Sequence, residues 1–313
     1  MLTKSKQAGK AGLLFLVCLF AVQAEAASEL QTSLNELMQK RRGNVLVADL
    51  RTGRLLAAWN SRQAFELAYP PGSTIKLFTA AAALEEGLIS PSEEVFCRRV
   101  PELLGEPFHC SHPLPGGAYT LSTALANSCN YFFSRLSLRI RADQLAHWFG
   151  AFGLGSAPGG IRIDADDAAK ARAALGAEGV TLSSAQLLEA YAAFANRGTA
   201  ARLRPPGVDA RAPALTVRLH PETFGTLSAG LEGCVRFGTC QGAAVEGVRV
   251  AGKTGTAPAL DGSGVTHAWF VGYAPADRPE VALVVFLERG TGQHDAAPLA
   301  GQILKCYFAK AKP

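Results

Sequence analysis

Three short polar segments stand out along the chain: Ser73-Thr74-Ile75-Lys76, Ser128-Cys129-Asn130 and Lys253-Thr254-Gly255. The first follows Tyr69-Pro70-Pro71-Gly72, which interrupts regular structure, and it opens an alanine-rich predicted helix. The second interrupts a mostly helical stretch, and the third lies on a predicted strand. A motif like the first is expected by chance roughly once in a few hundred residues, so the interpretation depends on all three together.

Predicted strands lie at both ends of the chain, and helices lie between them. Strands over 43–50 and 55–59 form one predicted hairpin, and strands over 268–273 and 281–287 form another. We therefore predict an α+β fold, an α/β sandwich in which an antiparallel sheet formed from both termini is flanked by helices, with an inserted, mostly α-helical subdomain. The predicted helices are 28–42, 73–86, 121–140, 143–152, 183–196, 221–234 and 296–310, whereas 91–119, 153–179 and 205–213 are predicted to be irregular.

The first 26 residues are typical of a cleaved signal peptide. Three lysines (Lys4, Lys6 and Lys10) precede an apolar run over 11–22 that is short for a membrane span, and Ala24-Glu25-Ala26 matches a cleavage pattern. An uncleaved membrane anchor is the alternative. Both interpretations predict export, to the periplasm or the extracytoplasmic face of the cytoplasmic membrane.

The remaining residues, 27–313, are predicted to form one domain. Its sheet parts are expected at about 43–70 and 215–313, and its helical insert at about 73–200. The chain of 313 residues is 48% hydrophobic and 18% charged, which indicates a globular protein. Its net charge of +5 is partly in the leader, and aromatic residues are not interleaved with basic ones, so no nucleic-acid partner is expected.

The cysteines permit disulfides if the protein is exported. Cys97–Cys110 and Cys234–Cys240 are the predicted pairs, because each would close a short loop. Buried free thiols are the alternative. The sequence contains no C-x-x-C pair and no His/Cys cluster of zinc-like spacing, so neither a metal nor a cofactor is predicted.

Ser73 and Lys76 have the spacing of a nucleophile and its base. Residues three apart share one helix face, so Lys76 is expected to reach the Ser73 hydroxyl. A serine hydroxyl needs a base to take its proton, and a lysine can serve when burial lowers its pKa. The alternative for this pair alone is a capping serine beside a solvated lysine.

Ser128 and Asn130 are short polar residues in an apolar helical stretch. If they face a cleft, Ser128 would relay a proton between Lys76 and a leaving amine, and Asn130 would hold a substrate amide. The alternative is that they face solvent or bond the backbone, as mid-helix polar residues usually do.

The third segment continues into Thr256 and is the most specific of the three. A lysine and the hydroxyls of Thr254 and Thr256 at a strand edge suit recognition of a carboxylate. Gly255 would permit close approach of a substrate backbone. The backbone N–H groups of Thr256 and Ser73 are the predicted oxyanion hole.

Taken together, the segments resemble the S-x-x-K, S-x-N and K-T-G motifs of the penicillin-binding protein transpeptidase domain, whose fold is shared with serine β-lactamases. The residues around each motif, the helix over 182–198 and the stretch over 268–275 are also similar to that family. The resemblance covers the chain from about Gly43 to its C-terminus.

The resemblance implies a D,D-transpeptidase that acts on peptidoglycan stem peptides ending in D-Ala-D-Ala. Ser73 would form the acyl-enzyme and release D-Ala, and an amine from a neighbouring stem peptide would resolve the ester as a cross-link. Water would give D,D-carboxypeptidase activity instead, and β-lactams would acylate Ser73 as inhibitors. Large family members carry a further N-terminal module, so cell-wall synthesis proteins are expected as partners that supply it.

Two alternatives belong to other functional classes. A class A β-lactamase would need a deacylating glutamate in an E-x-x-L-N pattern, and none of the five candidates (Glu178, Glu189, Glu222, Glu232 and Glu246) lies in one. A class D enzyme would have a different second motif. A β-lactam sensor or an inactive scaffold is disfavoured because every expected catalytic residue is present.

Overall fold

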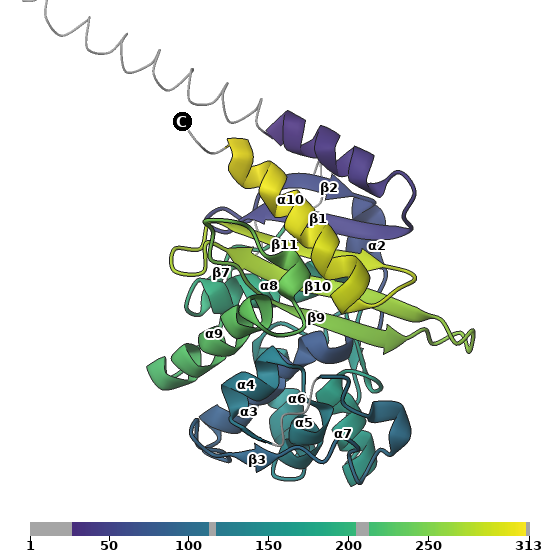
Figure 1. Ribbon diagram of the computed structural model, residues 1–313, viewed down its shortest axis with the longest axis vertical. Coiled ribbons are helices and arrows are strands. Elements are labelled where there is room, and N and C mark those ends of the chain that lie inside the picture. Colours follow the sequence, from purple (N-terminus) through teal and green to yellow (C-terminus); the bar gives the residue numbers. More distant parts are fainter. Residues whose placement is uncertain (1–26, 113–116, 205–212, 311–313) are drawn as a thin grey trace, which may run out of the picture.

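The computed structural model describes residues 27–112, 117–204 and 213–310. A five-stranded antiparallel sheet is the centre of the molecule, with strand order β2-β1-β11-β10-β9 (Figure 1). The outermost strand, β9, carries the Lys253 segment. The strands are β1 (Gly43–Asp49), β2 (Leu55–Trp59), β9 (Ala251–Pro258), β10 (Thr266–Ala274) and β11 (Val281–Leu287).

The pairing brings the two ends of the chain together, because β1 lies antiparallel to β11 from Gly43↔Leu287 to Asp49↔Val281. Strand β11 is buried on both faces, and it is consequently a continuous apolar run rather than an alternating one. Alternate residues of β11 belong to two separate cores: Val284 and Phe286 to one, Leu283 and Val285 to the other.

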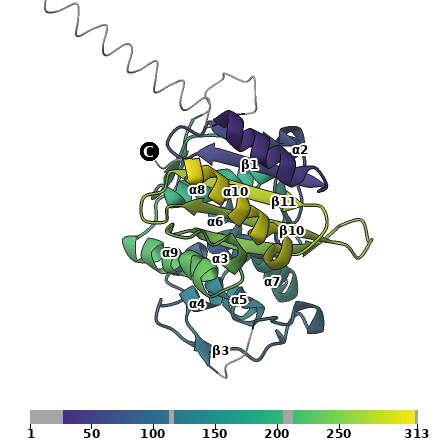
Figure 2. The ribbon, with the colours of Figure 1, turned by 45° about the horizontal axis from the view of Figure 1, so that its top comes forward.

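Helices cover both faces of the sheet. A helix over residues 27–38 and α10 (Ala297–Lys310) lie side by side over one face, as the two ribbon views show (Figures 1 and 2). The opposite face packs against α8 (Ser184–Ala195), whose residues are all buried. The predicted sandwich, with its sheet built from both termini, is therefore confirmed.

A helical subdomain lies beyond the β9 edge, at the bottom of Figure 1. Its long helix α9 packs along α4. The chain passes from α9 into β9, so α9 connects the subdomain to the sheet. The helices are α3 (Lys76–Glu85), α4 (Leu121–Ala126), α5 (Asn130–Ser137), α6 (Ala142–Ala151), α7 (Asp167–Leu175) and α9 (Pro221–Arg236), and a short α2 (Ser61–Glu66) adjoins the sheet.

The remaining elements are short. Among the described residues, three pairs of two-residue strands lie in the subdomain and at its borders, and short 3-10 or π turns connect larger elements. The pairs are β3 (Val95–Phe96) with β4 (Ala118–Tyr119), β5 (Gly160–Ile161) with β6 (Val180–Thr181), and β7 (Thr199–Ala200) with β8 (Leu215–Thr216); the turns are η1 (Gly72–Ile75), η2 (Glu106–Phe108), η3 (Gln241–Ala243) and η4 (Gly292–Ala296).

Two local predictions differ from the structure. The helix predicted from Ser73 begins as the 3-10 turn η1, whereas the predicted interruption of the helical stretch over 121–140 is confirmed by its division into α4 and α5. Helix α7 falls in a stretch predicted to be irregular; Asp166 caps its start and Gly176 ends it in the left-handed conformation. The predicted signal peptide lies outside the described residues. Among those described, no helix is sufficiently long and apolar to cross a membrane.

Candidate active site

Ser73 lies in η1, directly before α3, and is half-buried, whereas its neighbours in the turn are buried. Buried polar contacts hold this turn. The N–H of Gly72 donates to the carbonyl of Gly176 (2.9 Å), and the hydroxyl of Tyr191 donates to the carbonyl of Thr74 (2.8 Å). The indole N–H of Trp269 donates to Pro70 just before the turn (3.0 Å). The Ser73 backbone is therefore fixed from three sides.

The turn packs against the edge strand β9 at van der Waals distance. A Cβ at Gly72, whose φ is +55°, would meet the carbonyl oxygen of Thr256 at 2.7 Å, and one at Gly255 would meet that of Pro71 at 2.5 Å. The absence of a side chain at Gly255 therefore lets the nucleophile turn pack closely against β9, a role that the sequence did not predict.

Lys76 is fully buried at the first position of α3. Its Nζ donates to the carbonyl of Ser128 (2.9 Å) and to Oδ1 of Asn130 (2.5 Å), and lies 3.4 Å from the Ser128 hydroxyl. Burial lowers the pKa of Lys76 to about 8, although the thiols of Cys129 and Cys110 act in the opposite direction. A substantial fraction of this amine is therefore neutral near physiological pH.

The direct contact predicted between Lys76 and the Ser73 hydroxyl is not formed in this structure. Throughout the part of the chain that is described, no hydrogen bond joins these two groups, because the ammonium is directed into the Ser128 turn. Catalytic hydrogen bonds are often long before substrate binds. Because Ser73 lies one turn before Lys76, a change in the Lys76 rotamer would bring its amine toward the Ser73 hydroxyl.

Ser128 forms a left-handed turn between α4 and α5, with φ +56°. Such a conformation costs about 1–3 kcal/mol for a non-glycine residue and persists only where surrounding contacts impose it. Here Lys76 binds the Ser128 carbonyl, and the next residue, Cys129, caps α5 by accepting the N–H of Phe132 at Sγ (3.4 Å). Asn130 donates from Nδ2 to the carbonyl of Phe108 (3.1 Å), so its amide links Lys76 to a neighbouring loop.

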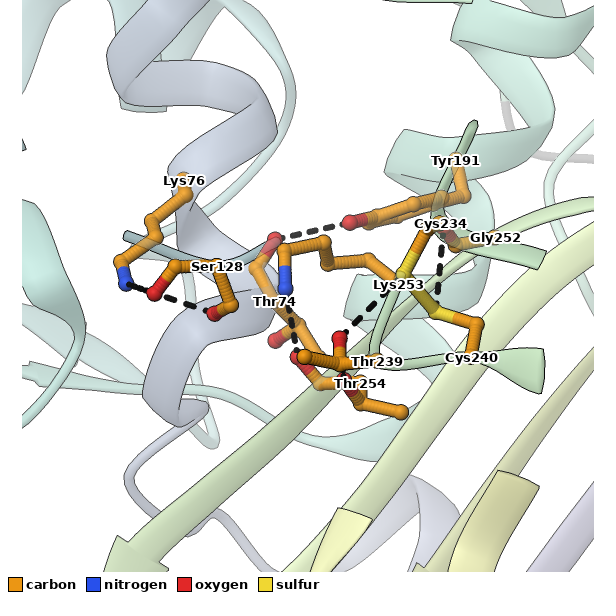
Figure 3. The surroundings of a disulfide bond; sticks show 10 residues. All are labelled: Thr74, Lys76, Ser128, Tyr191, Cys234, Thr239, Cys240, Gly252, Lys253 and Thr254. Atoms are coloured by element: carbon orange, nitrogen blue, oxygen red, sulfur yellow. Dashed lines mark hydrogen bonds between the residues drawn. A yellow bond between two sulfur atoms is a disulfide. The ribbon is translucent and has the colours of Figure 1, made fainter. Parts of the chain in front are cut away.

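On the other side, Lys253 is fully buried in β9, and its Nζ donates to the Thr254 carbonyl (3.1 Å). Burial, with the nearby positive charge of Lys76, lowers the pKa of Lys253 well below its usual value. Thr256 is exposed further along the strand, and its hydroxyl accepts the N–H of Gly292 (3.0 Å). Figure 3 shows the Lys253 side chain extending toward Thr74, with Lys76 and Ser128 beyond it.

A disulfide supports this side of the site. Cys234, in α9, is bonded to Cys240 (2.09 Å), and the loop that they close contains Thr239. The hydroxyl of Thr239 lies 2.6 Å from that of Thr254 (Figure 3). The short loop therefore braces the lysine-bearing strand through one hydroxyl contact.

The disulfide predicted between Cys97 and Cys110 is not formed: their sulfur atoms lie 3.7 Å apart and both residues are free cysteines. The sequence shows no His/Cys cluster of zinc-like spacing, yet the fold brings such residues together in space. Cys97 and Cys110 meet Cys129 and His112 in one buried group. Cys110 and His112 are two residues apart, but Cys97 and Cys129 lie 13 and 19 positions from Cys110 without a recognisable spacing, and the β3–β4 pair and the start of α5 bring the four residues together.

Sequence reasoning missed several residues that hold the site. Tyr191, Trp269 and Gly176 bind the nucleophile turn, and Thr239 binds the strand. Buried aromatic residues on a helix or strand look like ordinary core in a sequence, and only the tertiary structure reveals where a phenol or indole donates its hydrogen bond.

Comparison with known proteins agrees with this geometry. The family model "Penicillin binding protein transpeptidase domain" matches residues 43–305. The peptidoglycan D,D-transpeptidase PbpA of Mycolicibacterium smegmatis is 32% identical over 262 residues, which are 74% of this chain and 53% of that protein. The chain thus spans about half the length of such curated relatives.

Two solved structures are similar over nearly the whole chain. The transpeptidase domain of Burkholderia pseudomallei penicillin-binding protein 3 superposes with a TM-score of 0.77 at 25% identity, covering 92% of this chain and 93% of that one. The imipenem acyl-enzyme complex of penicillin-binding protein A from Mycobacterium tuberculosis superposes with a TM-score of 0.74 at 25% identity, covering 90% and 78%. This chain belongs to the family of penicillin-binding protein transpeptidase domains.

Proposed function

We propose that this protein is an exported peptidoglycan D,D-transpeptidase that acts through an acyl-enzyme at Ser73. The observation that carries the proposal is the buried Lys76 amine, one turn after Ser73, with a pKa lowered to about 8. A neutral amine in that position is the base that a serine nucleophile requires. Family membership and the D,D-transpeptidase names of the relatives support the same reaction.

Acylation begins when the Ser73 oxygen attacks the carbonyl of the penultimate D-Ala and its proton passes to Lys76. The oxyanion that forms is stabilised by the backbone N–H groups of Ser73 and Thr256. The C–N bond then breaks, and the leaving nitrogen takes a proton from Lys76 through the Ser128 hydroxyl, which lies 3.4 Å from Nζ. D-Ala departs and the stem peptide is held as an ester of Ser73.

The substrate lies along β9 in this scheme. An extended peptide that adds to an exposed strand edge gains main-chain hydrogen bonds, and β9 is the outer strand of the sheet. The terminal carboxylate is bound at Lys253 with Thr254 and Thr256, where its negative charge would offset the cost of burying the lysine's positive charge. Asn130 exchanges its contact with Phe108 for the substrate amide.

The second half-reaction decides between two activities. An amine from a neighbouring stem peptide attacks the ester, forms the cross-link and restores the Ser73 hydroxyl; attack by water would make the protein a D,D-carboxypeptidase. β-Lactams acylate the same serine and inhibit. The substrate lies outside the cytoplasm, in agreement with the predicted signal peptide, and cell-wall synthesis proteins are the proposed partners.

A β-lactamase remains disfavoured by the environment of its candidate bases. Three of the five glutamates are already engaged in ion pairs: Glu178 with Arg172 (2.8 Å), Glu189 with Arg202 (2.6 Å) and Glu232 with Arg249 (2.7 Å). A carboxylate oxygen bound to an arginine is not free to orient a water molecule for attack. Sustained turnover of nitrocefin by the purified protein would overturn this assignment.

The test is incubation of the purified protein with peptidoglycan, followed by quantification of cross-linked dimers and trimmed monomers. We expect dimers to accumulate with wild type and neither product with Ser73→Ala, whose fold is checked by circular dichroism. Trimmed monomers without dimers would indicate the carboxypeptidase. Equal products from wild type and variant would reject the Ser73 acyl-enzyme.

A further inference from the structure

Three thiols and one imidazole form a buried cluster around the Ser128 turn. Cys97 follows β3, Cys110 and His112 follow η2, and Cys129 lies between Ser128 and Asn130. Their sulfur and nitrogen atoms all lie within 4.8 Å of one another, and none of the four residues is more than 7% exposed. Nothing in the proposed acyl transfer uses these groups.

The spacing within this cluster is that of ligands around a metal ion. The sulfurs of Cys97 and Cys110 lie 3.7 Å apart, those of Cys110 and Cys129 lie 3.8 Å apart, and the Cys97 sulfur lies 3.7 Å from Nε2 of His112. Tetrahedral zinc with Zn–S near 2.3 Å and Zn–N near 2.0 Å places its ligand atoms about 3.6–3.8 Å apart. These three distances agree with those of a tetrahedral zinc shell, and the other pairs of ligand atoms lie within 4.8 Å.

Each sulfur also receives a backbone N–H, which suits a negatively charged thiolate. Arg99 donates to Cys97 (3.4 Å), Tyr131 to Cys110 (3.3 Å) and Phe132 to Cys129 (3.4 Å). Donors of this kind to ligating sulfurs belong to the outer shell of metal sites. They are backbone groups, so they persist whatever the side chains around them.

The imidazole has the matching outer-shell partner. The Nδ1 atom of His112 lies 3.0 Å from the hydroxyl of Tyr119 in β4, and its other nitrogen, Nε2, faces the sulfurs. A metal-ligating histidine usually engages its second nitrogen in such a hydrogen bond, which fixes the tautomer and the ring orientation. Tyr119 therefore orients Nε2 for binding.

We propose that Cys97, Cys110, His112 and Cys129 bind one zinc ion in a closed, tetrahedral site. Three thiolates and an imidazole are ligands that select zinc over harder cations such as magnesium and calcium. Binding displaces the thiol protons, which are released to solvent. A disulfide among these cysteines would instead leave the third thiol buried without a bonding partner among them.

The proposed site is placed to position the second catalytic motif. Cys129 carries the metal between Ser128 and Asn130, and Cys110 ties it to the loop whose Phe108 carbonyl accepts from Asn130. With all four positions filled by protein, the ion has no open position for substrate. It acts by fixing the Ser128 turn relative to Lys76.

Metal content of the purified full-length protein tests the proposal directly. After incubation with zinc and removal of the excess, we expect about one zinc ion per chain by inductively coupled plasma mass spectrometry. Cys306→Ser, the matched control outside the cluster, should retain the ion. Cys97→Ser and Cys110→Ser should lose the ion. Absence of bound zinc in wild type, or a disulfide between any two cluster cysteines in the zinc-treated protein, would overturn the proposal.

Tyr119→Phe provides a variant that spares all four ligands. Loss of its hydroxyl is expected to weaken zinc affinity about 10–100-fold, measured by competition with a chromophoric chelator. The cobalt-substituted wild type should show the visible bands of tetrahedral thiolate coordination. Unchanged affinity in Tyr119→Phe together with octahedral cobalt spectra would reject the site. These readouts do not depend on acyl transfer, so they separate this proposal from the proposed function.

Discussion

The two sides of the candidate active site are held in different ways. On the strand side, β9 pairs with β10 without interruption from Ala251↔Tyr273 to Pro258↔Thr266. Main-chain hydrogen bonds therefore fix Lys253 and its neighbours. On the helical side, the Ser128 turn has a left-handed φ and is fixed by side chains, chiefly Lys76 and the cysteine cluster.

This difference predicts that the two sides respond differently to substitution. A strand held by main-chain hydrogen bonds keeps its position when a side chain changes without moving the backbone. It loses that position when a substitution displaces the backbone. A turn held by side chains fails when those side chains are removed. Substitutions on the two sides should therefore differ in kind, and the following predictions test this from the largest effect to the smallest.

Lys76→Ala is expected to have the largest effect, because it removes both the proposed base and the main support of the Ser128 turn. The rate of acylation by a fluorescent penicillin should fall about 10²–10⁴-fold. The exposed Lys305→Ala is the matched control and should react as wild type does. A fall of less than about threefold in Lys76→Ala would place the base elsewhere.

Gly255→Ala tests the strand side, because the added methyl group would displace the backbone of β9. The added Cβ would meet the Pro71 carbonyl at 2.5 Å, so β9 and the Ser73 turn must separate. A misplacement of about 1 Å can slow a reaction on the order of 100-fold, and we expect that loss in the acylation rate together with a lower Tm.

Gly225→Ala is the matched control for this variant. Gly225 lies exposed in the interior of α9, and a Cβ there meets nothing within 4 Å. Its replacement should leave acylation unchanged and stabilise the protein by about 0.5–1 kcal/mol, because alanine is the better helix former. Wild-type kinetics in Gly255→Ala would show that the turn and strand have room to separate.

The pH dependence of acylation tests the helical side without a substitution. Only neutral Lys76 can accept the Ser73 proton, and its pKa is lowered to about 8. The rate should therefore rise about tenfold per pH unit below 8 and level off above it. Single-turnover labelling between pH 6 and 10 measures this profile. A rate independent of pH from 6 to 8 would contradict Lys76 as the base.

Loss of the Cys234–Cys240 disulfide should have the smallest effect. A loop of this length contributes about 2 kcal/mol on the chain-entropy model, and the double variant to serine should lower the free energy of unfolding by that amount. Because Thr239 braces Thr254 from this loop, acylation should slow only a few-fold. A larger loss of activity than of stability would show that Thr239 positions the strand more strictly than we infer.

The sheet was accessible from sequence because its determinants are local. Apolar strands such as Val281–Leu287 and the hairpins at each end of the chain predict an antiparallel sheet made from both termini. The three motifs likewise carry their residue types and order in the sequence. The structure places all three around one site, with Lys76 contacting Ser128 and the nucleophile turn contacting β9.

The support of the site was not accessible, because it depends on tertiary contacts. The left-handed φ of Ser128 is imposed by Lys76 and the surrounding fold, and sequence favours no such conformation for serine. The cluster joins Cys97 and Cys129 across loops and short strands whose path the sequence does not predict. The packing of Gly255 against Pro71 was likewise not accessible, because the two residues lie far apart along the chain.

The central claim is that Ser73 is the acylated nucleophile, and peptide mapping tests it most directly. The protein is treated with benzylpenicillin, digested with trypsin and analysed by mass spectrometry. We predict a penicilloyl adduct on the peptide over 63–76 that fragmentation assigns to Ser73, and no adduct in a folded Ser73→Ala variant. An adduct on another residue, or equal labelling of both proteins, would contradict the account.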